Sequence, residues 1–109
     1  MDKTARRAAA SAYKEQATAA GVYAVRCGDG VWVGATPTLD TLENRMRFAL
    51  RMGGWKTRAL QAAFTAAGEA SFGFEPLERA PADLGDIGRK SWLAERAAHW
   101  RAELGAQTD

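Results

Sequence analysis

Apolar residues alternate most clearly between residues 21 and 35, where many side chains are β-branched or aromatic. Residues 21–27 and 31–34 have this composition, and Gly28-Asp29-Gly30 separates them. Glycine permits the positive φ angles that a tight hairpin turn requires. The pattern therefore predicts a β-hairpin, with strands at about 21–27 and 30–35.

Helical spacing begins after the hairpin. Apolar residues from Leu39 to Leu50 recur every three or four positions, which predicts a helix at about 38–52. Gly53 and Gly54 follow it, and glycine ends helices because it adopts the left-handed conformation without steric cost. Similar reasoning, with good helix formers near the N-terminus, predicts three further helices, at about 4–19, 57–67 and 91–104.

Residues 71–77 alternate again and predict a third strand, in which Pro76 marks an edge or an end because it lacks an N–H group. Residues 80–90 are expected to form a loop. The expected fold is therefore α/β (α+β), with a small three-stranded, mainly antiparallel sheet flanked by helices. An N-terminal helix would occupy residues 1–20 and the rest of a single domain residues 21–109.

The chain has 109 residues, 47% of them hydrophobic and 26% charged, as expected for one globular domain. No apolar run approaches the roughly 20 residues of a membrane span, and no secretory signal is recognisable at the N-terminus. Cys27 is the only cysteine, which excludes an internal disulfide and a cysteine metal cluster. These features predict a cytoplasmic protein without a membrane partner.

The net charge is only +2, but it is distributed unevenly. Residues 1–58 carry ten lysines and arginines against five acids, and the remainder carries five against eight. The first half therefore has a net charge of +5 and the second half a net charge of −3. This asymmetry makes a polyanion such as DNA a plausible partner for the first half.

The hairpin resembles the signature of the GIY-YIG nucleases. Gly21-Val22-Tyr23 is similar to the first tripeptide of that family, and Trp32-Val33-Gly34 to the second. Four later segments are also similar to parts of the family, and the resemblance covers roughly residues 20–104. These segments are Gly34 to Leu39, Gly53 to Gly68, Phe72 to Glu78 and Glu95 to Trp100.

What the resemblance implies is metal-dependent hydrolysis of a DNA phosphodiester. In this family the tyrosines position or deprotonate a water, an arginine holds the scissile phosphate, and a glutamate holds a divalent cation such as magnesium or manganese. Carried over to matching positions, the resemblance makes Tyr23 and Arg45 catalytic candidates and puts Trp32 in the place of the second tyrosine. Trp32 cannot act as a base, because an indole has no hydroxyl group.

The resemblance does not identify the metal ligand directly. An ungapped comparison places Ala97 where the glutamate of the family falls, and Glu95 lies about 200° around the helix from it. We take Glu95 as the first candidate ligand, with a solvated carboxylate as the alternative. Glu75 and Glu78 are further candidates. Trp55 stands where some relatives carry a histidine, a second departure from the catalytic pattern of the family.

Four further basic residues are candidates for binding DNA: Arg47, Arg51, Lys56 and Arg58. Arg47 and Arg51 form an i, i+4 row with Glu43, so the alternative is a solvated, ion-paired helix face. Arg45 instead borders the buried stripe of the same helix, where it could face a site.

Three functions remain open at this point. The chain could be a small metal-dependent DNA endonuclease, or a nucleic-acid-binding module of the same fold that has lost catalysis through Trp32, Trp55 and Ala97. It could also be a protein-interaction domain, since its net charge is small. A nicking assay on supercoiled DNA with added magnesium separates the first from the other two.

Overall fold

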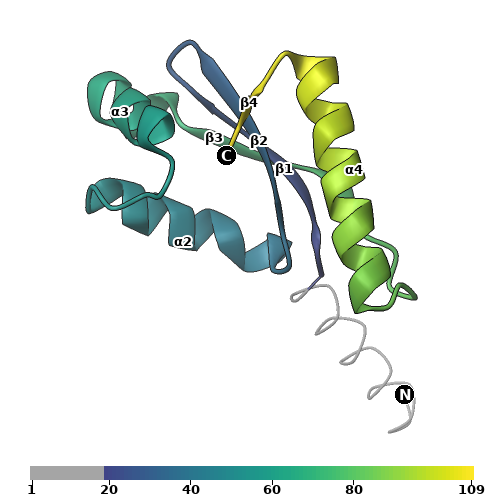
Figure 1. The fold of residues 1–109 in the computed structure, drawn as a ribbon. Coiled ribbons are helices and arrows are strands. Elements are labelled where there is room, and N and C mark those ends of the chain that lie inside the picture. The colour runs from purple at the N-terminus through teal and green to yellow at the C-terminus, as the bar shows by residue number, and fades with distance from the viewer. Residues whose placement is uncertain (1–18) are drawn as a thin grey trace, which may run out of the picture.

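The computed structural model describes residues 19–109, and the helix predicted at about 4–19 lies outside the described residues. The described part contains a four-stranded sheet and three α-helices (Figure 1). In chain order the elements are β1 (Gly21–Cys27), β2 (Gly30–Thr36), α2 (Leu39–Arg51), α3 (Arg58–Ala67), the short 3-10 helix η1 (Glu69–Ser71), β3 (Gly73–Arg79), α4 (Asp86–Leu104) and β4 (Gln107–Thr108).

The predicted hairpin is confirmed. β1 and β2 pair in antiparallel register along their whole length, from Gly21 opposite Thr36 to Cys27 opposite Gly30. Gly28 in the connecting turn has a φ of 57°, which a residue with a Cβ adopts only at a steric cost. The glycine at this position therefore permits the tight reversal.

The sheet has four strands in the order β3-β1-β2-β4, rather than the three expected. β3 pairs antiparallel with β1, and β4 pairs parallel with β2, so the sheet is mixed. The prediction missed β4 because two residues, Gln107 and Thr108, are too short to show a hydrophobic period. This added strand directs the C-terminal end of the described chain along the edge of β2.

Helices cover both faces of the sheet (Figure 1). Side chains alternate along β1, so its buried residues belong to two separate cores. The core beneath α2 and α3 contains Tyr23, Val25, Cys27, Trp32, Leu39, Leu42, Met46, Leu50, Leu60, Phe64 and Phe72. The core beneath α4 contains Val22, Ala24, Val33 and Ala97, with Leu93 and Trp100 packed against it.

α4 begins at Asp86, five residues before its predicted start. Pro81 and several small residues suggested that the loop would continue to residue 90. The helix instead begins after Gly85, with Asp86 in its first turn, where a negative charge interacts favourably with the helix dipole. No helix in the described part of the chain is long and apolar enough to span a membrane.

Glu78 connects β3 to α4. Its carboxylate accepts hydrogen bonds from Arg96 Nε at 2.7 Å and from Trp100 Nε1 at 3.0 Å. The Trp100 bond, together with Arg96, holds the pKa of Glu78 below its ordinary value of 4.5. A carboxyl group whose pKa is lowered on folding stabilises the protein above its unfolded pKa, and this stabilisation is lost as the pH falls through the folded pKa.

We therefore expect the free energy of unfolding to decrease as the pH falls below about 4.5, and Glu78→Gln to reduce that decrease. Urea unfolding of both proteins at a series of pH values measures the effect. Glu75→Gln is the matched control, because Glu75 lies on the same strand and is exposed. Equal acid sensitivity in the Glu78 variant and the unmodified protein would show that this link does not stabilise the fold.

Candidate active-site pocket

A pocket of about 360 Å³ opens between the end of β2 and α2. Its walls come from β1, the end of β2, the turn before α2, α2 itself and the loop after it. The lining residues are Tyr23, Ala35, Thr36, Pro37, Thr38, Leu42, Arg45, Trp55 and Lys56. Two of these residues are cationic, one is a tyrosine and two are threonines, a composition that suits an anionic, hydrogen-bonding ligand.

One cation of the pocket comes from the middle of α2 and the other from the loop after it. Arg45 lies on the second turn of the helix and donates from Nη2 to the Thr38 hydroxyl at 2.5 Å. Lys56 follows the helix, and its Nζ lies 5.6 Å from the centroid of the Trp55 ring. Both side chains are exposed, so their charges are available to a bound anion.

Tyr23 forms the inner wall of the pocket. Its ring is stacked on Phe74, with centroids 5.3 Å apart, and only 1% of the residue is exposed. The phenol lies directly over Gly34 on the neighbouring strand, and a Cβ at Gly34 would overlap the ring and its hydroxyl. A glycine at position 34 is therefore needed for Tyr23 to occupy this position.

Asp109, which no sequence pattern indicated, joins three residues at this wall. Its Oδ2 accepts a hydrogen bond from the Tyr23 hydroxyl, and its Oδ1 accepts from Trp55 Nε1 at 3.0 Å and Thr57 Oγ1 at 2.6 Å. The Asp109 backbone N–H donates to Val33 O at 3.1 Å, continuing the pairing of β4 with β2. β4 thus places a carboxylate beside the phenol.

The environment of Tyr23 keeps its hydroxyl protonated. Burial is the largest cause that raises its pKa far above the ordinary value of 10, followed by the Asp109 charge and the hydrogen bond to Asp109. A phenol with such a raised pKa does not ionise near neutral pH, so it cannot serve as a general base there. Tyr23 can therefore orient Asp109 or a ligand, but it cannot itself remove a proton from water.

The fold of this chain is similar to that of a solved structure, the catalytic domain of the homing endonuclease I-TevI. The TM-score is 0.67, and the sequences are 23% identical over 82% of this chain and 96% of that chain. The chain has a GIY-YIG-like fold. This confirms the fold expected from the two tripeptides of the hairpin. No family model matches the sequence, and no curated protein is significantly similar to it.

Trp32, which the sequence resemblance puts in the place of the second tyrosine, belongs to the core. It is 2% exposed, packs in the cluster beneath α2 and α3, and is not among the residues that line the pocket. A Cβ at Gly30 would overlap its ring. Its Nε1 is buried and has no hydrogen-bond partner among the described residues. The structure therefore places Trp32 in a packing position, away from the chemistry expected of the second tyrosine.

Glu95 lies on a helix that covers the other face of the sheet from Tyr23 and Arg45. It lies on α4, whose Ala97 is buried against Val22 and Val33, on the sheet face opposite the Tyr23 core. A separation of two residues turns Glu95 about 200° away from Ala97, and Glu95 is exposed. Ala97 thus fills the inward position on this helix, and the Glu95 carboxylate faces solvent.

The described residues provide few ligands for a metal ion. No group of three or more His, Cys, Asp or Glu side chains in this part of the chain could hold one. Asp109 is the carboxylate at the Tyr23 wall, and both of its oxygens accept hydrogen bonds from protein donors. Magnesium in proteins is often held by one or two carboxylates together with substrate phosphates. The site therefore suits such an ion only if the Asp109 carboxylate and a bound phosphate coordinate it together.

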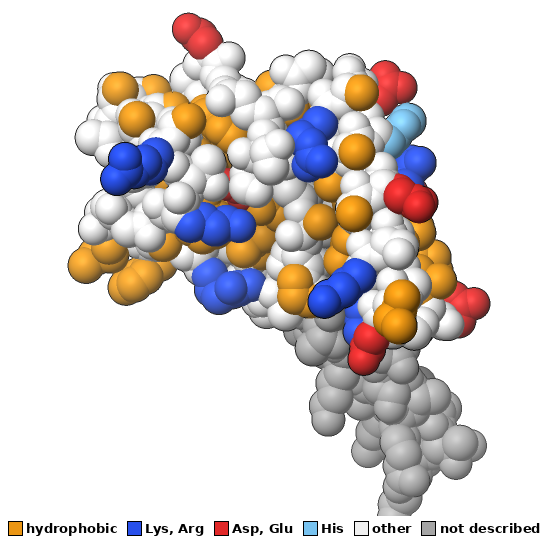
Figure 2. Space-filling view, in the orientation of Figure 1, with side chains coloured by type: hydrophobic (Ala, Val, Ile, Leu, Met, Phe, Trp, Pro, Cys, Tyr) orange, Lys and Arg blue, Asp and Glu red, His pale blue; other side chains and the backbone are white. Residues whose placement is uncertain are grey.

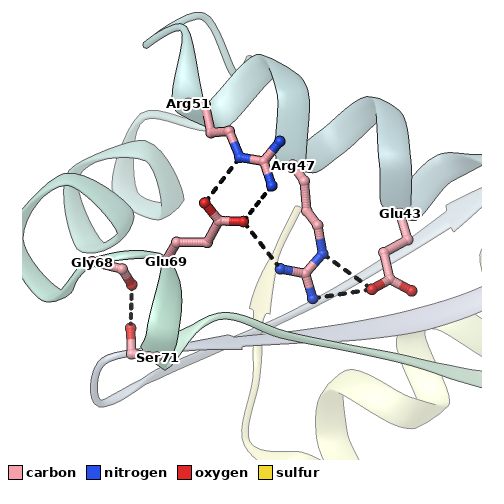
Figure 3. A network of polar contacts seen from close by, with 6 residues as sticks. All are labelled: Glu43, Arg47, Arg51, Gly68, Glu69 and Ser71. Atoms are coloured by element: carbon pink, nitrogen blue, oxygen red, sulfur yellow. Dashed lines mark hydrogen bonds and ion pairs between the residues drawn. The ribbon is translucent and has the colours of Figure 1, made fainter.

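Arg47 and Arg51 are engaged with acidic residues, as the ion-paired alternative anticipated (Figure 3). Arg51 Nη2 lies 2.5 Å and Arg47 Nη1 3.6 Å from the Glu69 carboxylate, and Arg47 Nη2 lies 3.1 Å from Glu43. The Arg47 guanidinium also lies 4.5 Å from the centroid of the Phe72 ring. These partners offset the charge of both arginines. Among the basic residues predicted to bind DNA, Lys56 therefore lies at the pocket, while Arg58 is exposed at the start of α3.

Proposed function

We propose that this protein binds DNA and hydrolyses a phosphodiester bond held in the Tyr23–Arg45–Lys56 pocket. The observation that supports this most directly is that two exposed cations and a buried tyrosine line one pocket. A guanidinium and an ammonium group attract a phosphate and stabilise the negative charge that develops on it during attack. The GIY-YIG-like fold, shared with the catalytic domain of a homing endonuclease, favours this reaction class.

In this proposal each residue has a distinct task. Arg45 and Lys56 hold the phosphate, and Thr38 holds Arg45 in place through the 2.5 Å hydrogen bond. Tyr23 fixes Asp109 by donating to it, and Asp109 accepts the proton of the attacking water. With a magnesium or manganese ion bound, Asp109 would be its ligand instead of the base, and the ion would supply a Lewis acid at a phosphate oxygen and acidify the water.

A second candidate is a DNA-binding module without cleavage. Two observations favour it: the Tyr23 hydroxyl stays protonated, and Trp32 has no hydroxyl and is buried. Nicking of supercoiled DNA, with and without magnesium or manganese, separates the two candidates. Nicking that requires the added metal supports the hydrolase, whereas binding without nicking supports the module.

DNA binding through this pocket should depend on salt in a way that reports individual contacts. Arg45→Ala and Lys56→Ala should each reduce the slope of log affinity against log salt concentration by about 0.7–0.9, because one phosphate contact is lost. Fluorescence anisotropy of a labelled duplex between low and moderate salt measures the slope. Lys90→Ala is the control, since Lys90 is exposed on α4. Slopes that do not differ from that of the control would place DNA on another surface.

A further inference from the structure

Two large apolar side chains project into solvent at the end of α2, one from its last turn and one from its C-cap. Phe48 is 65% exposed and Met52 is 71% exposed. They are four residues apart, so they lie next to each other on one side of the helix. Single exposed apolar residues are common, whereas contiguous exposed apolar side chains mark contact surfaces.

This pair lies on the same side of α2 as Arg45. At 100° per residue, Arg45, Phe48 and Met52 fall within a sector of about 60° around α2, along one side of the helix. Arg45 lines the pocket, and the loop that follows Met52 brings Lys56 to its other wall. Figure 2 shows hydrophobic side chains projecting at the lower left, at the end of α2, beside lysine and arginine side chains. The apolar pair and Arg45 thus lie along one side of α2, and Lys56 follows in the next loop.

We propose that Phe48 and Met52 contact the bases of a DNA duplex at an unstacked step while Arg45 and Lys56 hold its backbone. This inference rests on the proposed function and specifies its substrate as duplex DNA that is opened or kinked beside the bound phosphate. Phenylalanine and methionine are among the side chains that DNA-binding proteins insert between base steps. Aromatic side chains also stack on unpaired bases without regard to sequence.

Charge favours DNA over a second copy of the chain as the molecule that binds this surface. In a symmetric dimer the same patch of each copy meets its counterpart. Pairing through Phe48 and Met52 would therefore bring Arg45 and Lys56 close to the same residues of the other copy. Like charges repel when they are desolvated together, whereas the phosphates of DNA neutralise them. The nearby cations thus favour DNA, whose phosphates are negatively charged and whose stacked bases provide apolar surfaces.

The test compares the full chain with a double variant, Phe48→Ala and Met52→Ala. Two measurements are made: anisotropy of a labelled duplex containing one mismatch, and fluorescence of a 2-aminopurine placed beside that mismatch. The unmodified protein should increase the 2-aminopurine fluorescence by unstacking it. The double variant should lose this increase and bind about tenfold to a hundredfold more weakly, with the salt slope unchanged. Ile87→Ala, which removes an 83% exposed side chain on α4, is the matched control and should behave as the unmodified protein.

The outcomes separate this inference from the proposed function. Absence of DNA binding, or a salt slope unaffected by Arg45→Ala and Lys56→Ala, overturns the proposed function and this inference with it. DNA binding that depends on those cations, but is equally tight in the double variant, overturns this inference alone. A concentration-dependent dimer in sedimentation that the double variant abolishes, with DNA affinity unchanged, assigns the surface to self-association and also overturns it.

Discussion

Replacing Arg45 with alanine is expected to lower the rate of DNA nicking by about 100- to 1000-fold, because removal of one charged group that stabilises the transition state has effects of this size. Arg45 is exposed and its hydrogen-bond partner is Thr38. The free energy of unfolding should therefore change by less than about 1 kcal/mol. Nicking of supercoiled DNA, followed at saturating protein, measures the rate, and thermal unfolding confirms that the variant is folded.

Two further variants test whether the Arg45 guanidinium itself, in this pocket, is required for nicking. Arg45→Lys keeps the charge but loses the planar, bidentate geometry, so it should recover binding more than rate. Glu95→Gln removes the carboxylate that faces solvent on α4, and it should nick DNA as the unmodified protein does. Nicking that survives Arg45→Ala but is lost in Glu95→Gln would show that the reaction takes place on α4 and not in this pocket.

The hairpin and α2 could be predicted from the sequence because their signals are local. The side-chain period changes from two to three or four at Pro37, and glycines at 28 and 53 mark the turn and the end of the helix. A period of this kind reports which residues one element buries, and it needs no information about distant partners. The same locality explains why α3 also agrees closely with its predicted range.

Contacts between distant segments could not be predicted in this way. β4 is defined by its pairing with Trp32 and Val33, not by a pattern within Gln107 and Thr108. Asp109 reaches Tyr23 only through that pairing, across 86 positions of the sequence. A short polar segment after a predicted helix is indistinguishable from a loop until its partner strand is known. The carboxylate that holds Tyr23 and Trp55 therefore became visible only in the structure.

The candidate site itself was predicted in part. Tyr23 and Arg45 line one pocket, as the hairpin and the following helix suggested. Arg47 and Arg51 have charges of the required sign, but Glu69 comes from a separate element to meet both. The sequence shows the charges but not the ion pair with Glu69, so it could not show that these arginines are paired while Lys56 lies at the pocket. The inward position of Ala97 on the last helix could be predicted from helical spacing, but the side of the sheet on which α4 packs could not.

The last prediction concerns Asp109, which holds three donors at once. Asp109→Ala leaves the Tyr23 hydroxyl, Trp55 Nε1 and Thr57 Oγ1 without their common acceptor. A buried donor that loses its partner costs about 1–3 kcal/mol, and Tyr23 is the most buried of the three. We therefore expect the variant to lose about 2–5 kcal/mol of unfolding free energy. Asp109→Asn, which keeps one acceptor oxygen without the charge, should lose less. Urea unfolding near neutral pH measures both losses.

The same variant tests why the Tyr23 pKa is raised. The chain has two tyrosines, so a Tyr13→Phe background leaves Tyr23 as the only phenol, and its absorbance can be followed with pH. Because its pKa is raised on folding, Tyr23 stabilises the protein below its ordinary pKa of 10, and this stabilisation decreases as the pH rises above that value. Asp109→Ala removes two of the three causes but leaves burial, so the phenol should titrate at lower pH than in the parent yet still above 10. A parent protein whose phenol ionises near 10 while folded would contradict the hydrogen bond to Asp109.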